Sequence, residues 1–351
     1  MTPRVTIDPI DEQIDCDEDE TVLDAAFRHG YNLVYGCREG QCSACKCFLL
    51  EGEVTLKPYS TFALSDTEES QGYTLLCRAM PDTDLVVELL HYDPDNYRLD
   101  VPIRDGVATV TSIERLTHDI VGLKLDVSEP ADFDFIPGQY VDLWVPGSEE
   151  RRSFSMANAA GEGIELMIKC YPGGRFSALL DGELKPGDEL KFTGPFGSFR
   201  LRESENPILL VAGGSGMAPV LSLLRQLAGA GSERPIRFFY GARTEADLFY
   251  VDEIAVLGES LPHFEFCAVL SEAGADSEWA GERGFVHEAA GRYLDAVGAE
   301  TVETYTCGPP PMVDALTELL TERFSIDESR IFFDKFTTAA GATDEKGSTA
   351  T

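Results

Sequence analysis

The residues with the clearest chemical spacing are four cysteines in the N-terminal part of the chain. Cys37, Cys42 and Cys45 follow the pattern C-x4-C-x2-C, and Cys77 comes after 31 intervening residues. Thiolate sulfur is a soft ligand that suits ferric iron and sulfide. This spacing is typical of [2Fe-2S] ligation, in which one loop gives three ligands and a distant strand gives the fourth. The sequence therefore predicts that these four cysteines hold a [2Fe-2S] cluster.

Small residues around the cysteines support this prediction. Gly36 and Gly40 let backbone N–H groups approach a cluster and stabilise its negative charge. A structural zinc site is the alternative, but such sites usually show two C-x2-C pairs, and this stretch has one. Cys47 lies two positions after Cys45, at the start of an expected strand, and its side chain is predicted to enter the core.

The stretch YGCREGQCSACKC, together with LLCRA around Cys77, resembles the N-terminal ferredoxin domain of the reductase components of bacterial oxygenases. The resemblance implies three domains in order: a β-grasp [2Fe-2S] ferredoxin, an antiparallel β-barrel that binds FAD, and a Rossmann-like parallel-sheet domain that binds NADH. The fold class expected is therefore α+β and α/β, multidomain.

Two further motifs resemble the FAD-binding part of this family. RSFS matches the family pattern R-x-[Y/F]-[S/T], and YPGGRFS follows it. An arginine can pair with a pyrophosphate, an aromatic ring can pack on the isoalloxazine, and a hydroxyl can bond flavin N5. Backbone N–H groups at a helix start suit a diphosphate. The residues that the resemblance assigns to FAD are Arg152, Phe154, Ser155, Gly174, Phe176 and Ser177, with Ser155 also expected to take part in catalysis.

The nicotinamide motifs come later in the chain. AGGSGMAP follows the strand PILLV and departs from G-x-G-x-x-G, but it resembles the glycine turn of the same family. CGPPPM resembles the family's second nicotinamide motif, which would place Cys307 near the nicotinamide ring; the alternative is a buried thiol at a strand end. The aromatic residue expected against the flavin is Phe336, with Phe333 as the alternative, and Cys307 and Phe336 are predicted to be catalytic. The residues assigned to the nicotinamide dinucleotide are Gly213, Gly214, Gly216, Cys307, Gly308 and Pro309.

Strands and helices must position these motifs, and the sequence predicts where several of them begin and end. In residues 3–97, the ferredoxin part, the helix TVLDAAFRHG begins with Thr21 and Asp24 in a capping-box spacing and closes on Gly30. The strands expected there are Cys47–Val54, Thr74–Ala79 and Leu85–Leu90.

Residues 103–203 show six strand-like runs separated by Gly, Pro and Asp clusters, which predicts a small antiparallel barrel. Residues 206–337 alternate strand, glycine turn and helix, which predicts a parallel sheet with helices on both faces. Residues 338–351 have no periodicity and are expected to form a flexible tail.

The charge of the chain limits its partners. The 351 residues include 62 Asp and Glu against 28 Lys and Arg, a net charge of -34, and residues 1–100 hold 21 acidic and 7 basic side chains. This balance argues against nucleic acid or an anionic membrane as a partner and favours a basic protein face. The first ten residues lack a basic start followed by a long apolar stretch, so we expect a cytoplasmic protein.

The family resemblance implies an NADH-dependent reductase component that passes electrons through FAD and the cluster to the hydroxylase of a soluble di-iron monooxygenase, of the methane, propane, alkene, phenol or toluene type. A benzoate-type Rieske dioxygenase is the alternative partner. A zinc-stabilised interaction module would explain the cysteines but not the other motifs. NADH is expected rather than NADPH, because Glu245 and Asp247 lie near Arg243, the residue that could meet a 2'-phosphate.

Overall fold

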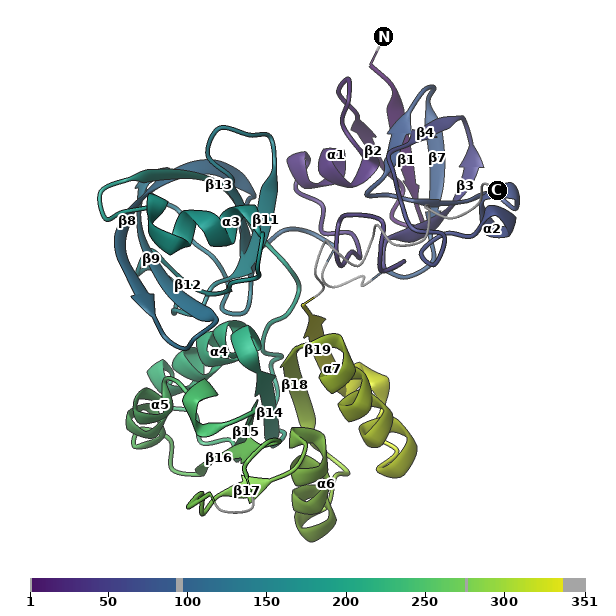
Figure 1. Cartoon of the computed structure of the whole chain (residues 1–351). Helices are drawn as coiled ribbons and strands as arrows, with labels where there is room; N and C mark the ends of the chain where they lie inside the picture. Colours follow the sequence, from purple (N-terminus) through teal and green to yellow (C-terminus); the bar gives the residue numbers. More distant parts are fainter. Residues whose placement is uncertain (1, 93–96, 275–276, 337–351) are drawn as a thin grey trace, which may run out of the picture. The chain divides into compact units, whose positions relative to one another are not determined.

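The computed structural model describes residues 2–92, 97–274 and 277–336. The chain forms two compact units, Met1–Ile103 and Arg104–Thr338 (Figure 1). The domain boundary predicted between 203 and 206 falls inside the second unit, and the expected tail at 338–351 lies outside the described residues. None of the helices in the described ranges combines the length and apolar character needed to cross a bilayer.

The first unit contains a mixed five-stranded sheet in the order β2-β1-β7-β3-β5, with β1 and β7 parallel. Its strands are β1 (Arg4–Asp8), β2 (Glu12–Asp15), β3 (Lys46–Glu51), β5 (Tyr73–Leu75) and β7 (Leu85–Leu89), and β4 (Val54–Leu56) pairs separately with β6 (Ala79–Pro81). The helices are α1 (Val22–Arg28) and α2 (Asp66–Ser70). This sheet and α1 give the β-grasp arrangement expected from the cysteine motif.

Helix α1 confirms the predicted cap, because the Asp24 N–H donates to Thr21 Oγ1 at 3.2 Å. Two strand predictions were wrong in their limits. Cys47–Val54 is interrupted after Glu51, since Gly52 adopts a φ of +96° and turns the chain. Thr74–Ala79 breaks into two strands at a turn that closes between the Leu75 carbonyl and the Arg78 N–H at 2.8 Å, and this turn carries Cys77.

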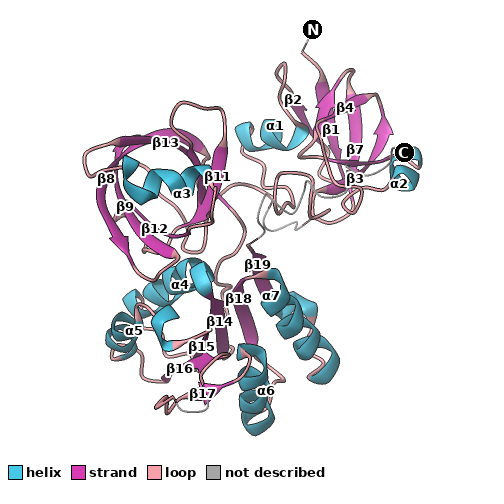
Figure 2. Cartoon of the chain, in the orientation of Figure 1, coloured by secondary structure: helices cyan, strands magenta, loops and turns pink. Residues whose placement is uncertain are grey.

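The second unit begins with the antiparallel barrel that the sequence predicted. Its six strands follow the order β11-β10-β13-β8-β9-β12 and enclose a core of buried aliphatic and aromatic side chains. The strands are β8 (Arg104–Arg115), β9 (Ile120–Glu129), β10 (Tyr140–Trp144), β11 (Arg151–Ser155), β12 (Ile164–Lys169) and β13 (Glu189–Phe196). Figure 2 separates these strands from the short helix α3 (Arg175–Ala178), whose Phe176 packs into the barrel core.

The rest of the unit is a parallel sheet in the order β17-β16-β15-β14-β18-β19. Its strands are β14 (Ile208–Gly213), β15 (Ile236–Ala242), β16 (Phe264–Leu270), β17 (Glu282–Arg283), β18 (Glu303–Gly308) and β19 (Ile331–Lys335), and its helices are α4 (Met217–Gly229), α5 (Val251–Gly258), α6 (Val286–Val297) and α7 (Pro310–Glu318). The chain order reverses between β14 and β18, which makes their carboxyl ends the expected ligand site. Helices α4 and α5 cover one face of the sheet and α6 and α7 the other (Figure 1).

The barrel and the parallel sheet share one continuous core. Barrel residues in the core under α4 include Ile120, Ala157 and Met167. Above this core, Arg225 of α4 donates to Glu165 of β12 at 3.0 Å and also pairs with Glu253 of α5. The Tyr250 hydroxyl donates to the other Glu165 oxygen at 2.7 Å. A mostly buried ionic network therefore joins the two sheets of the second unit.

Candidate functional site

The loop that carries three of the predicted cluster ligands points backbone N–H groups at sulfur. The N–H groups of Glu39 and Gln41 lie 3.4 and 3.2 Å from Cys37 Sγ, and the Cys37 N–H lies 3.2 Å from Cys42 Sγ. Gly40 adopts a φ of +68°, and a Cβ there would stand 2.7 Å from Tyr59 Cβ, so the loop requires glycine at this position. Such N–H groups stabilise negative charge on bound thiolates.

The four predicted ligands are arranged as two pairs. The contact with Cys42 lowers the pKa of the Cys37 thiol to about 5 and raises the pKa of Cys42. The contact with Cys45 likewise raises the pKa of Cys77, and the Leu76 N–H donates to the Cys45 carbonyl at 3.1 Å. The turn after β5 thus carries the fourth thiol from outside the loop to the other three.

This pairing fits a two-iron cluster better than zinc. Four thiolates around one tetrahedral zinc at 2.3 Å would all lie about 3.8 Å apart. Within the described part of the chain, no three cysteine sulfurs lie within 4.8 Å of one another. A [2Fe-2S] cluster takes two ligands on each of its irons, so close contacts are needed only within pairs. Cys47 is fully buried in β3, as predicted for a core residue, and burial alone raises its pKa.

The predicted flavin residues lie on β11, at Gly174 directly before α3, and in α3 itself. The rings of Phe154 and Phe176 are 4.9 Å apart, and Ser155 is buried. In the second motif the Tyr171 N–H donates to Ser177 Oγ at 2.9 Å. A Cβ on Gly174 would come within 2.8 Å of that same oxygen, so the tight turn depends on glycine.

A carboxylate joins these two motifs. Glu150 accepts from Arg152 at 2.9 Å through one oxygen and from Arg175 at 2.5 Å through the other. The bond from Arg175 is the main reason why the pKa of Glu150 lies below its usual range. Two guanidinium groups that converge on one anionic group suit a diphosphate. The sequence analysis missed Arg175, although it lies inside the GGRFS motif that was singled out.

The two nicotinamide motifs are packed against each other at the ends of β14 and β18. A Cβ on Gly216 would stand 2.2 Å from the Cys307 carbonyl oxygen, and one on Gly213 would stand 2.5 Å from Met312 Sδ. Gly214 has open space around it but adopts a φ of +57°. The glycines are therefore required for close approach of the chain at two positions and for backbone conformation at the third.

Strand β19 brings further predicted residues beside Cys307. The Phe336 N–H donates to the Gly308 carbonyl at 3.0 Å, and its ring packs on the core that contains the buried Cys307. The alternative, Phe333, is 48% exposed. Asp334 pairs with Cys307 across the two strands, and burial raises its pKa to about 6. The sequence analysis missed Asp334, because nothing in RIFFDKF shows which strand lies alongside it.

A cavity of about 270 Å³ opens at the carboxyl ends of β14, β15 and β16. Of the predicted nicotinamide residues, Gly213, Gly214 and Pro309 line it, whereas Gly216, Cys307 and Gly308 lie outside its lining. Phe336, predicted against the flavin, also lies outside it. The barrel contributes lining residues as well, so the cavity belongs to both parts of the second unit. The barrel residues are Thr117, Asp119, Ile120 and Lys169.

Comparison with known proteins matches three domain families along the chain. Residues 5–82 match the 2Fe-2S iron-sulfur cluster binding domain, residues 107–201 the oxidoreductase FAD-binding domain, and residues 210–318 the oxidoreductase NAD-binding domain. The matches follow the order of domains that the motifs predicted.

Relatives match over almost the whole chain. The reductase component of propane 2-monooxygenase from Mycolicibacterium goodii is 48% identical over 95% of this chain and 97% of its own. The electron transfer component of toluate 1,2-dioxygenase from Pseudomonas putida is 33% identical over 97% of this chain and 100% of its own. Among solved structures, the Amycolatopsis cytochrome P450 reductase GcoB is 33% identical with a TM-score of 0.86, covering 96% of this chain and 100% of its own.

The cluster assignment predicts that substitution of one buried cysteine removes the cluster and that substitution of another leaves it in place. Cys77→Ser is expected to remove the broad visible absorbance of an iron-sulfur cluster and to lower bound iron well below two atoms per chain. Cys47→Ala is the matched control, because its thiol is equally buried but contacts no predicted ligand. Iron and sulfide analysis with absorption spectra checks both. Loss of the cluster in Cys47→Ala with retention in Cys77→Ser would contradict the assignment.

The close approach of Gly216 to β18 predicts a large effect from one methyl group. Gly216→Ala is expected to lower the free energy of unfolding by more than about 3 kcal/mol, because backbone atoms cannot move aside as a side chain can. Gly229→Ala at the other end of α4 meets no atom within 4 Å and is expected to stabilise the protein by about 0.5–1 kcal/mol. Thermal unfolding measures both variants. Equal stabilities would show that the contact is not tight.

Proposed function

The chain belongs to the reductase components of bacterial oxygenases, and from this premise we propose that it passes electrons from NADH to the hydroxylase of a soluble di-iron monooxygenase. The observation that carries the proposal is the 48% identity with a propane 2-monooxygenase reductase component over 95% of this chain. The three matched domains supply the carriers that this route needs. When bound, FAD accepts a hydride from NADH, and FAD and the cluster then pass electrons on singly.

The residues of the second unit bind and orient the reactants. Arg152 and Arg175, which now share Glu150, would hold the FAD diphosphate, and the Ser155 hydroxyl would donate to flavin N5. Gly214, which lines the cavity and has open space around it, would let the dinucleotide approach the chain before α4. The buried cores on both faces of the sheet exclude water from the region around Cys307.

The first unit carries the cluster ligands, so we expect electrons to leave the protein through this unit. Phe62 is 85% exposed and belongs to the segment that covers the cysteine loop, where the Ser60 N–H donates to the Gly40 carbonyl at 2.9 Å. Helix α2 follows directly and carries Asp66, Glu68 and Glu69 in its first turn. An exposed aromatic ring beside acidic groups suits a basic partner face with an apolar centre. We infer that the hydroxylase docks over Phe62.

A Rieske dioxygenase remains the second candidate partner. The toluate 1,2-dioxygenase electron transfer component resembles this chain over 97% of its length, against 95% for the propane 2-monooxygenase component, but at 33% rather than 48% identity. The choice of partner depends on the surface of the first unit and not on the dinucleotide sites, so identity in the FAD and NAD domains does not distinguish the two.

Partner choice is tested by mixing the NADH-reduced protein with each oxygenase under anaerobic conditions. We expect reoxidation of the flavin and cluster to be at least about tenfold faster with the di-iron hydroxylase of a propane monooxygenase than with the Rieske oxygenase of a benzoate-type system. Stopped-flow absorbance follows the reaction. Faster reoxidation by the Rieske oxygenase would replace the first candidate with the second.

Docking over Phe62 predicts separate charge and contact effects. Electron transfer to the hydroxylase is expected to slow at least about fivefold as salt rises from 50 to 500 mM, because ions screen steering by the acidic first unit. Phe62→Ala is expected to slow it at every salt concentration, whereas Val256→Ala, an exposed apolar change on α5, is expected to have no effect. A rate independent of salt and of Phe62 would place docking elsewhere.

A further inference from the structure

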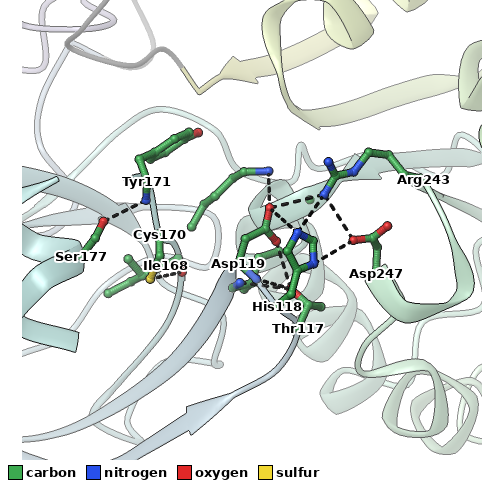
Figure 3. A network of polar contacts seen from close by, with 12 residues as sticks. Thr117, His118, Asp119, Ile168, Cys170, Tyr171, Ser177, Arg243 and Asp247 are labelled. Carbon is green, nitrogen blue, oxygen red and sulfur yellow. Dashed lines mark hydrogen bonds and ion pairs between the residues drawn. The ribbon is translucent and has the colours of Figure 1, made fainter. Parts of the chain in front are cut away.

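Charged side chains from the barrel and from the parallel sheet meet at the cavity (Figure 3). We call this group the ribose cluster, and its members are His118, Asp119, Lys169, Arg243 and Asp247. The first two lie in the turn between β8 and β9, and Lys169 ends β12. The last two follow β15. All but His118 line the cavity.

Arg243 stands between the two carboxylates of the cluster. Its Nη2 lies 3.4 Å from Asp119 Oδ2 and 3.3 Å from Asp247 Oδ1. His118 Nε2 lies 3.3 Å from the same nitrogen. Lys169 Nζ lies 3.1 Å from Asp119 Oδ2, so that carboxylate is shared by two cations. Partial burial would raise the pKa of Asp119, but the hydrogen bond and charge of Lys169, together with Thr117 and His118, hold the pKa below its usual range.

The position of the cluster indicates which part of a dinucleotide it would meet. In sheets of this topology, the residues that follow the second strand meet the ribose of the adenosine half. An acidic residue there accepts a hydrogen bond from the 2'-hydroxyl of NADH, and an arginine there pairs with the 2'-phosphate of NADPH. This chain has both kinds of residue after β15, and the barrel adds a second carboxylate from outside the nucleotide-binding fold.

We propose that Asp119 of the barrel acts with Asp247 to select a dinucleotide whose adenosine ribose has a free 2'-hydroxyl, and so to exclude a 2'-phosphate. With His118 neutral, the two carboxylates balance the charges of Lys169 and Arg243, so these four charges sum to zero and Arg243 has no unbalanced charge for a phosphate. A ribose 2'-hydroxyl can donate a hydrogen bond to either carboxylate, whereas a 2'-phosphate would be repelled by the negative charge of both. The selection depends on the barrel as well as on the nucleotide-binding sheet.

The inference rests on the proposed function in one respect, because it takes the cavity as the nicotinamide dinucleotide site. Phe285 also lines this cavity and is 61% exposed, so its ring offers a face on which adenine can stack. Stacking does not distinguish the two dinucleotides, since they carry the same base. Phe285 therefore separates binding from selection in an experiment.

The test measures binding of AMP and of 2'-phospho-AMP to the FAD-loaded full chain by titration calorimetry. The wild-type protein is expected to bind AMP at least about tenfold more tightly. Asp119→Asn keeps the shape of the side chain and the hydrogen bond from Thr117 but removes one negative charge. The variant is expected to reduce the ratio of the AMP affinity to the 2'-phospho-AMP affinity about tenfold. Phe285→Ala is expected to weaken both ligands by the same factor.

Asp126→Asn is the matched control, because Asp126 lies exposed on β9 and outside the cavity lining. It is expected to leave the ratio unchanged. The second measurement is the rate of flavin reduction by NADH and by NADPH, recorded by stopped-flow absorbance. In Asp119→Asn the ratio of the NADH rate to the NADPH rate should fall in parallel with the ratio of the AMP and 2'-phospho-AMP affinities.

The outcomes separate this inference from the proposed function. Equal binding of AMP and 2'-phospho-AMP by the wild-type protein, or an unchanged ratio in folded, FAD-loaded Asp119→Asn, would overturn the role of Asp119. Absence of flavin reduction by either dinucleotide would instead contradict the proposed reductase function, while the AMP ratio would still report on the cluster.

Discussion

The ion pair between Arg225 and Glu165 fixes the barrel against the parallel sheet, and both dinucleotide sites depend on that arrangement. Arg225 lies eight residues after Met217, the first residue of α4, so about 12 Å of rigid helix separates the glycine turn from the barrel. The pair is mostly buried, and loss of one partner of such a pair typically costs about 3–5 kcal/mol. Hydride transfer needs the nicotinamide and the flavin in contact, so this helix and its ion pair set the geometry of the reaction.

The sequence predicted the parts of the site whose chemistry dictates residue type. Cluster ligation requires thiolates at fixed spacing, and the tight turn before α4 requires glycine, so both can be recognised as sequence patterns. Contacts between segments far apart in the chain cannot be recognised in this way. Arg243 and Asp119 are 124 residues apart, and nothing in either segment indicates that the other lies beside it. Helix α6 was not predicted, although Gly284, with a φ of +102°, lies two residues before its start.

The same arrangement serves different acceptors in related proteins. The relatives compared above are named for a monooxygenase, a dioxygenase and a cytochrome P450, and each resembles this chain over 95% or more of its length. On the proposal that the hydroxylase docks over Phe62, the acceptor is recognised by the surface of the first unit and not by the dinucleotide sites. In that proposal, the features that recognise the acceptor are the strongly acidic first unit and the exposed Phe62.

The central claim is that electrons from NADH reach a two-iron cluster held by the two cysteine pairs. Electron paramagnetic resonance of the FAD-loaded protein, frozen after anaerobic addition of NADH, tests it most directly. The account predicts the signal of a reduced [2Fe-2S] cluster, approaching one spin per chain, that is absent before NADH is added. A protein that holds zinc in place of iron, or a cluster that dithionite reduces but NADH does not, would contradict it.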